Sequence, residues 1–336
     1  MRALATLCLL HASFAYADEP APEAPPQADA EVHDANTFGA SLQALSAQVM
    51  GVSVSWAGYG DVSAVVTGDG EGGVGKFIFD AYHFNPIVSA QAGQKARAEM
   101  ELEVEHGGEL IKIEYAVFDV IVNPRITVRS GKLLVPIGEF NDILHPSFKW
   151  TQATRPAMMR EVIPAIWSDV GVSAFGEFGP QGAAVGDWVV YAVNGLATEE
   201  VDPTNATLIR DSRDNFRDNN VDKGLGARVR LFAAKGATYG DSTFTVSGYT
   251  GALDDASAHR WSAVDVAFRT RFGPFHLLAE GAITSLTDAS DALGLGERTL
   301  MTPFEGGLYV YPHLKLGKVV TGARYDLTHT GPRLDH

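Results

Sequence analysis

The sequence has a single cysteine, Cys8, which lies in an N-terminal segment with the features of a secretory signal peptide. Arg2 supplies a positive charge, residues 3–10 form a short apolar run, and Ala15-Tyr16-Ala17 fits the small-residue cleavage rule. Cleavage there removes residues 1–17 and leaves a mature chain without cysteine. Disulfides, a thiol nucleophile and zinc–thiolate sites are therefore excluded from the mature chain.

Long apolar runs and basic residues are also scarce. No other segment has the roughly 18 consecutive apolar residues that a transmembrane helix requires. The chain has 26 Lys and Arg against 41 Asp and Glu, and without Arg2 the net charge is 25 − 41 = −16. This acidic balance argues against nucleic-acid binding, which requires a basic surface.

Motifs of catalysis and cofactor binding are missing as well. The sequence contains no Gly-x-Ser-x-Gly elbow, Walker A loop or dinucleotide fingerprint. Ser173, His145 and Asp169 could be combined into a triad, but no local motif supports one. We therefore expect no enzyme activity and no cofactor.

The sequence does show a strict alternation of polar and apolar residues, repeated almost to its end. Three segments carry charges at every second position: Glu99, Glu101, Glu103 and Glu105; Arg228 and Arg230; Arg269 and Arg271. The positions that alternate with these charges are mostly large and apolar, with Thr270 between the last two arginines. A period of two predicts strands with one polar and one apolar face. A membrane barrel directs the apolar face to lipid and the charges to its lumen.

The alternation predicts thirteen strands with no long helix between them. They span residues 52–66, 77–89, 98–106, 110–122, 126–137, 169–178, 187–196, 224–234, 242–250, 261–272, 275–286, 302–311 and 317–327. Most are close to the nine to eleven residues that cross a bilayer when tilted. The predicted fold class is all-β, a transmembrane antiparallel up-and-down β-barrel over residues 51–336.

The connections between these strands differ in length. Residues 123–125, 235–241, 273–274 and 311–316 are short, 287–301 is intermediate, and 139–168 and 197–223 are long. Short and long connections alternate, as in outer-membrane barrels with periplasmic turns and external loops. The tight Gly107-Gly108 turn does not fit this pattern. Because bacterial single-chain barrels have even strand numbers, thirteen strands suggest a truncated C-terminus and 14–16 strands in all.

Residues 18–50 precede the predicted barrel and are rich in Ala, Pro and Glu at their start. This composition predicts a disordered periplasmic linker. Residues 37–50 could form a short helix that associates with copies of itself. A tether with marginal helicity is the favoured interpretation, because one short helix is weak in water.

Residues 126–138, ITVRSGKLLVPIG, are interpreted as a strand with a bulge near Ser130-Gly131. The bulge would place Arg129 and Lys132 together in the lumen. It would direct five apolar side chains toward lipid: Ile126, Val128, Leu133, Val135 and Ile137. The following segment, 139–168, is predicted to be a long functional loop that folds into the barrel and narrows it.

This region carries a resemblance to a known family. The runs GKLLVPIGEFNDILHPSF and RPAMMREVIPAIWSDVGV resemble the phosphate-selective porin O/P family and related outer-membrane porins. The matching positions are Gly131, Lys132, Val135, Pro136, Gly138, His145, Pro146, Arg155, Pro156, Ile163, Pro164, Trp167, Asp169, Gly171 and Val172. The resemblance is specific over about forty residues. It implies a sixteen-stranded barrel, usually trimeric, that passes small solutes.

The candidate site residues follow from the predicted lumen and loop. Basic pore-lining candidates are Lys112, Arg129, Lys132, Arg228, Arg230, Arg269, Arg271 and Arg324. Acidic candidates on the same lumen are Glu99, Glu101, Glu103, Glu105, Glu114, Asp265 and Asp326. Constriction-loop candidates are His145, Arg155, Arg160, Trp167 and Asp169. Because this lumen is mixed in charge, we expect modest or no ion preference in place of phosphate selectivity.

Metal-binding patterns are weak. Residues 211–222 could hold calcium through Asp214, Asp218 and Asp222, but they lack the Gly and Glu of an EF-hand loop. A solvated external loop is the favoured interpretation. His83, His145 and Asp142 fit no ligand spacing, so we predict no metal site.

The sequence thus predicts a bacterial outer-membrane porin for passive diffusion of small hydrophilic solutes or ions. Its expected partners are outer-membrane lipid, the solutes themselves and two further copies in a homotrimer. Two alternatives stay open: a non-conducting outer-membrane barrel with a surface-binding or structural role, and a secreted soluble β-protein that binds glycans.

Overall fold

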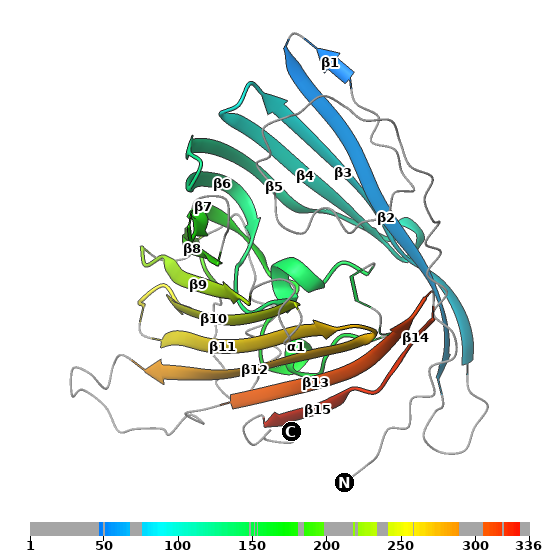
Figure 1. Cartoon of the computed structure of the whole chain (residues 1–336). Helices are drawn as coiled ribbons and strands as arrows, with labels where there is room; N and C mark the ends of the chain where they lie inside the picture. Colours follow the sequence, from blue (N-terminus) through cyan, green and yellow to red (C-terminus); the bar gives the residue numbers. More distant parts are fainter. Residues whose placement is uncertain are drawn as a thin grey trace. The chain divides into compact units, whose positions relative to one another are not determined.

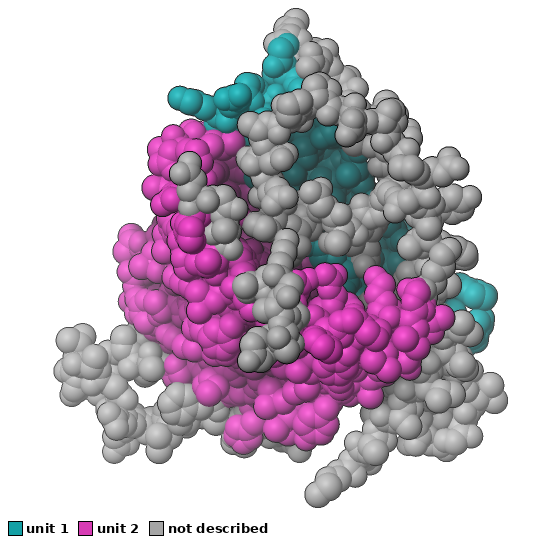
Figure 2. Space-filling view, in the orientation of Figure 1, with its two compact units in different colours: residues 1–116, 146–154 teal, residues 117–145, 155–336 magenta. Residues whose placement is uncertain are grey.

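The computed structural model describes residues 47–49, 51–67, 76–147, 149–150, 152, 154–180, 185–197, 218, 221–233, 241–257, 259–288, 305–317 and 319–329. The chain divides into two compact units, coloured separately in Figure 2. Unit 1 comprises residues 1–116 with 146–154, and unit 2 comprises residues 117–145 with 155–336. Within the described ranges, no helix has the length and apolar character to cross a membrane. The predicted signal peptide lies outside these ranges.

Unit 1 is an antiparallel sheet whose strands pair in chain order (Figure 1). Its strands are β1 (Ala47–Val49), β2 (Val52–Thr67), β3 (Lys76–Ala92) and β4 (Ala96–Glu105). A 3-10 turn, η2 (His106–Gly108), leads into β5 (Leu110–Asn123), which begins in unit 1 and ends in unit 2.

Unit 2 continues as an antiparallel sheet in chain order (Figure 1). Its further strands are β6 (Ile126–Leu134), β7 (Ser168–Phe178), β8 (Gly186–Val193), β9 (Gly224–Phe232), β10 (Asp241–Ala252), β11 (His259–Phe272), β12 (Phe275–Asp288) and β13 (Glu305–Leu316). β14 (Val319–Gly322) and β15 (Tyr325–His329) both pair with β13. A π-helix, η3 (Phe140–Leu144), and a short helix, α1 (Met158–Glu161), lie between β6 and β7.

Each of the thirteen predicted strands overlaps an observed strand, and the last one is divided into β14 and β15. One observed strand, β1, was not predicted: it lies in the 37–50 segment, for which a short helix was considered and a tether with marginal helicity was favoured. Residues 47–49 are not helical, because they pair antiparallel with β2 at Val52–Val54. Pairing with a sheet edge satisfies the backbone better than an isolated short helix can. The rest of the predicted linker and helix, residues 18–46 and 50, lies outside the described residues.

The two faces of the unit 2 sheet differ in character. On β11, Trp261, Ala263 and Asp265 are buried, whereas Val264 is 56% exposed and Val266 is also exposed. Phe268 of β11 is exposed as well, and neighbouring strands repeat this arrangement with exposed large apolar side chains at Val229, Leu231, Phe244, Val246 and Ile283. A sheet that exposes its apolar face and covers its charged face has the arrangement expected of a membrane barrel.

The pairing of β6 with β7 corrects the predicted bulge. Residues 127–134 pair with 168–175 without any register shift across Ser130 and Gly131. Strict alternation therefore places Arg129 and Lys132 on opposite faces of β6. Leu133 lies on the Arg129 face and is buried, not lipid-facing as predicted. β6 also ends at Leu134, so the predicted strand was three residues too long.

Candidate functional site

The connection between β6 and β7, residues 135–167, is the most deeply buried connection that the structure describes. The helix α1, in the part of this segment that belongs to unit 2, lies beside β13 and β15 (Figure 1). The side chains of Val135, Phe140, Met158 and Trp167 have 0% exposure. The nine residues 146–154 of the segment belong to unit 1, and the remainder belongs to unit 2.

The side chain of Asn141 joins the first and last residues of this segment, Val135 and Trp167. Its Nδ2 donates to the carbonyl oxygens of Val135 and Trp167, both at 2.8 Å. Its Oδ1 accepts the backbone N–H of Trp167 at 2.8 Å, and the N–H of Val135 donates to the Trp167 carbonyl at 2.9 Å. The buried amide of Asn141 therefore hydrogen-bonds to the backbone of both the first and the last residue of the connection, at the point where β6 ends.

The backbone at residues 139 and 140 is held by Glu280 of β12. Oε1 of Glu280 accepts the backbone N–H groups of Glu139 at 2.8 Å and Phe140 at 3.3 Å. Its Oε2 accepts the hydroxyl of Tyr309, on β13, at 2.6 Å. Gly138 permits this approach, because it has a φ of +64° and a Cβ there would overlap Glu280 Oε1.

Neighbouring strands add further contacts to the same residues. Thr245, on β10, donates to Oε1 of Glu139 at 2.6 Å, and Arg269 Nε lies 3.8 Å from its Oε2. Arg228, on β9, donates to the Gly138 carbonyl at 3.1 Å and to Asp142 at 2.5 Å. These charge-assisted hydrogen bonds fix the start of the segment on the polar face of the sheet.

The end of the segment around α1 is held by β15 and the residues before it. The backbone N–H of Ala157 donates to Asp326 Oδ1 at 3.0 Å. Arg324 donates to Asp326 at 2.7 Å and to the carbonyl of Arg155 at 3.2 Å. Thr328 donates to Glu161 at 2.7 Å. The segment thus contacts the sheet near both of its ends.

Trp167 anchors the return of the chain into β7. Its ring packs edge-on against Tyr249 at 4.7 Å and against Trp261 at 6.2 Å between centroids. Asp169, two residues on, is buried and accepts the backbone N–H of Gly195 at 2.8 Å. Both residues were predicted as constriction candidates, and both support the segment from its C-terminal end.

The other loop candidates differ in exposure. His145 is buried, Arg155 is half-buried and Arg160 is exposed on α1. Arg160 is therefore the loop candidate whose charge is most accessible to a solute.

The basic candidates of unit 2 are largely neutralised by acids on adjacent strands. Arg129 makes a two-point contact with Asp119, at 2.7 and 3.0 Å, and its guanidinium lies 5.0 Å from the ring of Phe175. Arg230 donates to Asp187 at 2.9 Å, and Arg271 donates to Asp241. The structure pairs each of these cations with an acid that the sequence analysis did not name.

The glutamate series of β4 lies on one face of unit 1. Glu101 accepts the hydroxyl of Tyr59 at 2.7 Å and an N–H of Asn85 at 2.8 Å. Glu99 accepts hydrogen bonds from Ser89 at 2.8 Å and Tyr115 at 3.0 Å. Lys112 Nζ lies 2.7 Å from Glu103 and 3.8 Å from Glu114. On this face, the carboxylates of Glu99 and Glu101 are engaged in hydrogen bonds to neighbouring strands.

Two acids of the possible calcium loop, Asp218 and Asp222, are described. Asp218 pairs with Lys223, and Asp222 pairs with Arg260 at 2.8 Å. Asp214 lies outside the described residues.

Comparison with known proteins places this geometry in context. No family model matches the chain. An uncharacterized protein of Aquifex aeolicus (strain VF5) is 27% identical over 199 residues, which cover 57% of this chain and 44% of that protein. The matched part therefore spans less than half of that relative's length.

Solved structures match over most of the chain. The anion-selective porin from Comamonas acidovorans aligns with a TM-score of 0.54 and 10% identity, over 82% of this chain and 79% of that chain. The outer-membrane channel DcaP of Acinetobacter baumannii aligns with a TM-score of 0.53 and 12% identity, over 84% and 81%. The fold is that of the bacterial outer-membrane porins.

A third match, Salmonella typhi OmpF in complex with daunomycin, has a TM-score of 0.53 and 10% identity, over 84% of this chain and 81% of that chain. The porin fold confirms the all-β barrel class that the alternation predicts, and the predicted outer-membrane localisation agrees with it. At these identities the likeness concerns the fold alone.

Proposed function

We propose that this protein is an outer-membrane channel for passive diffusion of small hydrophilic solutes or ions. One observation carries the proposal: the parts of the β6–β7 connection that belong to unit 2 are hydrogen-bonded to the charged face of its sheet, while the opposite face exposes apolar side chains. In a barrel, that arrangement gives a lipid-facing wall and a polar lumen narrowed by an inserted segment.

The proposed orientation follows from the antiparallel topology. In unit 2, the turns 124–125 and 273–274 lie at one end of the strands, and the connection 135–167 lies at the other. Outer-membrane barrels have short periplasmic turns and longer external loops. We therefore assign the long connections to the cell exterior.

We assign residues 1–17 to a signal peptide because of their positive charge, apolar run and small-residue cleavage motif. Sequencing the N-terminus of the mature protein from outer membranes tests the cleavage after Ala17.

The proposed channel has weak ion preference. Its support is the pairing of Arg129, Arg230, Arg271 and Lys112 with acids, since a paired cation contributes little net field to a lumen. The resemblance to the phosphate-selective O/P family is thus proposed to extend to the barrel and its loop but not to phosphate selection. Reversal potentials in a salt gradient, with and without phosphate, measure this directly.

A homotrimer is part of the proposal, because the family resemblance implies one. Chemical cross-linking of the folded protein in detergent tests it. Bands at three times the chain mass support the trimer, and a monomer at all cross-linker concentrations contradicts it.

The decisive experiment is planar-bilayer recording of the folded protein. A channel gives discrete, ohmic steps, and a variant with residues 146–154 replaced by a shorter Gly-Ser linker gives larger steps. Steps of unchanged size would remove the constriction role from the 139–168 loop. A folded, inserted protein without steps would instead be a non-conducting barrel.

A further inference from the structure

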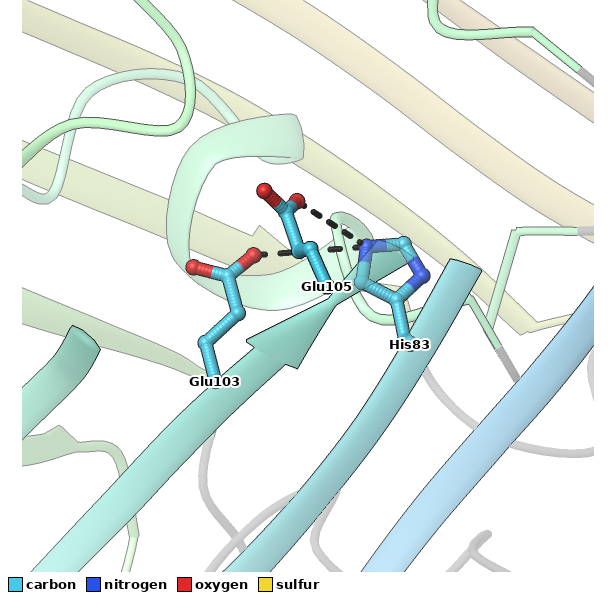
Figure 3. A group of neighbouring side chains, drawn as sticks. All are labelled: His83, Glu103 and Glu105. Atoms are coloured by element: carbon cyan, nitrogen blue, oxygen red, sulfur yellow. Dashed lines mark ion pairs between the residues drawn. The ribbon is translucent and has the colours of Figure 1, made fainter. Parts of the chain in front are cut away.

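His83, Glu103 and Glu105 lie together on the charged face of unit 1 (Figure 3). Nε2 of His83 is 3.5 Å from Oε1 of Glu105 and 4.0 Å from Oε1 of Glu103. One potential ligand atom from each residue lies within 4.8 Å of the others. Two carboxylates and one imidazole nitrogen therefore face a common point.

The strand register brings these residues together. Asp61 of β2 pairs with His83 of β3, and His83 pairs with Glu105 of β4. The three residues form one row across three strands. Glu103 lies two residues before Glu105, on the same face of β4. The arrangement is thus built on paired strands and does not depend on a loop.

Asp61 orients the imidazole. Nδ1 of His83 lies 2.7 Å from Oδ1 of Asp61, and both side chains are largely buried. A carboxylate that accepts the Nδ1 proton leaves Nε2 with its lone pair directed away, toward the two glutamates. Metal-binding histidines characteristically donate their second ring N–H to such a partner.

We propose that His83, Glu103 and Glu105 bind a divalent transition-metal ion of the zinc type. Ligands about 2.1 Å from zinc in a tetrahedral site are about 3.4 Å apart. The two distances from Nε2, 3.5 and 4.0 Å, are close to that spacing. One imidazole and two carboxylates suit zinc and its neighbours better than calcium, which prefers six or more oxygens.

The surrounding charges suit a bound cation. Glu103 is 2% exposed, and Lys112 lies 2.7 Å from its Oε2, which leaves Oε1 on the His83 side. Adjacent carboxylates with one lysine retain an excess of negative charge that a divalent ion neutralises. Three protein ligands leave a fourth position for water. The site lies on β3 and β4 and includes no residue of the 135–167 segment.

Zinc titration of the mature chain tests the proposal. The protein carries no affinity tag, is folded in detergent, is stripped with a chelator and is then titrated with ZnCl₂ by calorimetry. We expect one zinc per chain. Glu105→Gln removes a ligand and keeps the side-chain shape, and it is expected to weaken zinc binding at least tenfold. Asp61→Asn leaves the ligands intact and is expected to weaken binding about tenfold through loss of imidazole orientation.

His259→Ala is the matched control, because His259 pairs with Asp254 in the same way but belongs to no group of three potential metal ligands among the described residues. It should bind zinc as the unmodified chain does. Heat-dependent gel mobility verifies that each variant is folded, and either Glu105→Gln or Asp61→Asn suffices for the test. Absence of zinc binding by the folded unmodified chain overturns the proposal. Zinc binding unchanged in a folded ligand or Asp61 variant also overturns it, because His83 and its acids would then form only an internal ion pair.

Discussion

Glu280 Oε1 accepts the backbone N–H of Glu139 at 2.8 Å, across 141 residues of sequence. This contact joins the wall strand β12 to the start of the 135–167 segment. Glu280 is buried, and Tyr309 completes its hydrogen bonds. The position of the segment therefore depends on one wall carboxylate as well as on the segment's own sequence.

Replacing Glu280 tests that dependence. Glu280→Ala leaves two buried backbone N–H groups without their acceptor, which costs about 1–3 kcal/mol each and favours release of the segment. We expect a lower free energy of unfolding in urea and a larger, noisier single-channel conductance. Glu280→Gln keeps an acceptor oxygen and should behave nearly as the unmodified protein. Equal conductance of Glu280→Ala and the unmodified channel would show that the segment does not need this anchor.

Gly138 should tolerate no side chain. Gly138 and Gly317 have the same φ of +64°, but only at position 138 would a Cβ meet neighbouring atoms, among them Asp265 Oδ1 at 2.9 Å. Gly317→Ala should therefore report backbone strain alone, about 1–2 kcal/mol. Gly138→Ala should cost more and should alter conductance. Equal losses of unfolding free energy in the two variants would contradict the tight contact with Glu280.

Charge-reversal variants of Arg129 and Lys132 test which face of β6 lines the lumen. Arg129 lies on the charged face beside Asp119, whereas the regular register puts Lys132 on the opposite face. We expect Arg129→Glu to shift the reversal potential toward cations and Lys132→Glu to shift it less. If Lys132→Glu has the larger effect, the assignment of the lumen face is wrong.

Trp167 should be important for stability because it is fully buried between Tyr249 and Trp261. Trp167→Ala removes the whole ring and should cost about 3–5 kcal/mol of unfolding free energy. Trp167→Phe keeps an aromatic ring and should cost less. The temperature at which the folded gel band disappears gives a convenient ranking, and an unchanged temperature for Trp167→Ala would contradict the packing role.

The strands could be predicted from sequence because alternation is a local property. β2, β5, β7 and β11 begin and end within about two residues of the predicted ranges. The same reasoning failed at Val135–Ile137, where apolar residues at alternate positions were assigned to lipid. They are buried by the returning segment at Trp167, and a local pattern carries no information about that contact.

The contacts of the site could not be predicted, because they depend on register and on long-range approach. Arg129 was a candidate, but its partner Asp119 follows only from the placement of β5 beside β6. Glu280 appeared as one polar residue among many on an alternating strand. From the sequence, His83 was considered only together with His145 and Asp142. Its pairing with Glu105 follows from the register of β3 and β4.

Single-channel recording of the folded protein in planar bilayers tests the central claim most directly. The account predicts discrete, ohmic conductance steps that become larger when the 146–154 part of the segment is shortened. Folded protein that inserts into the bilayer and gives no steps would contradict it.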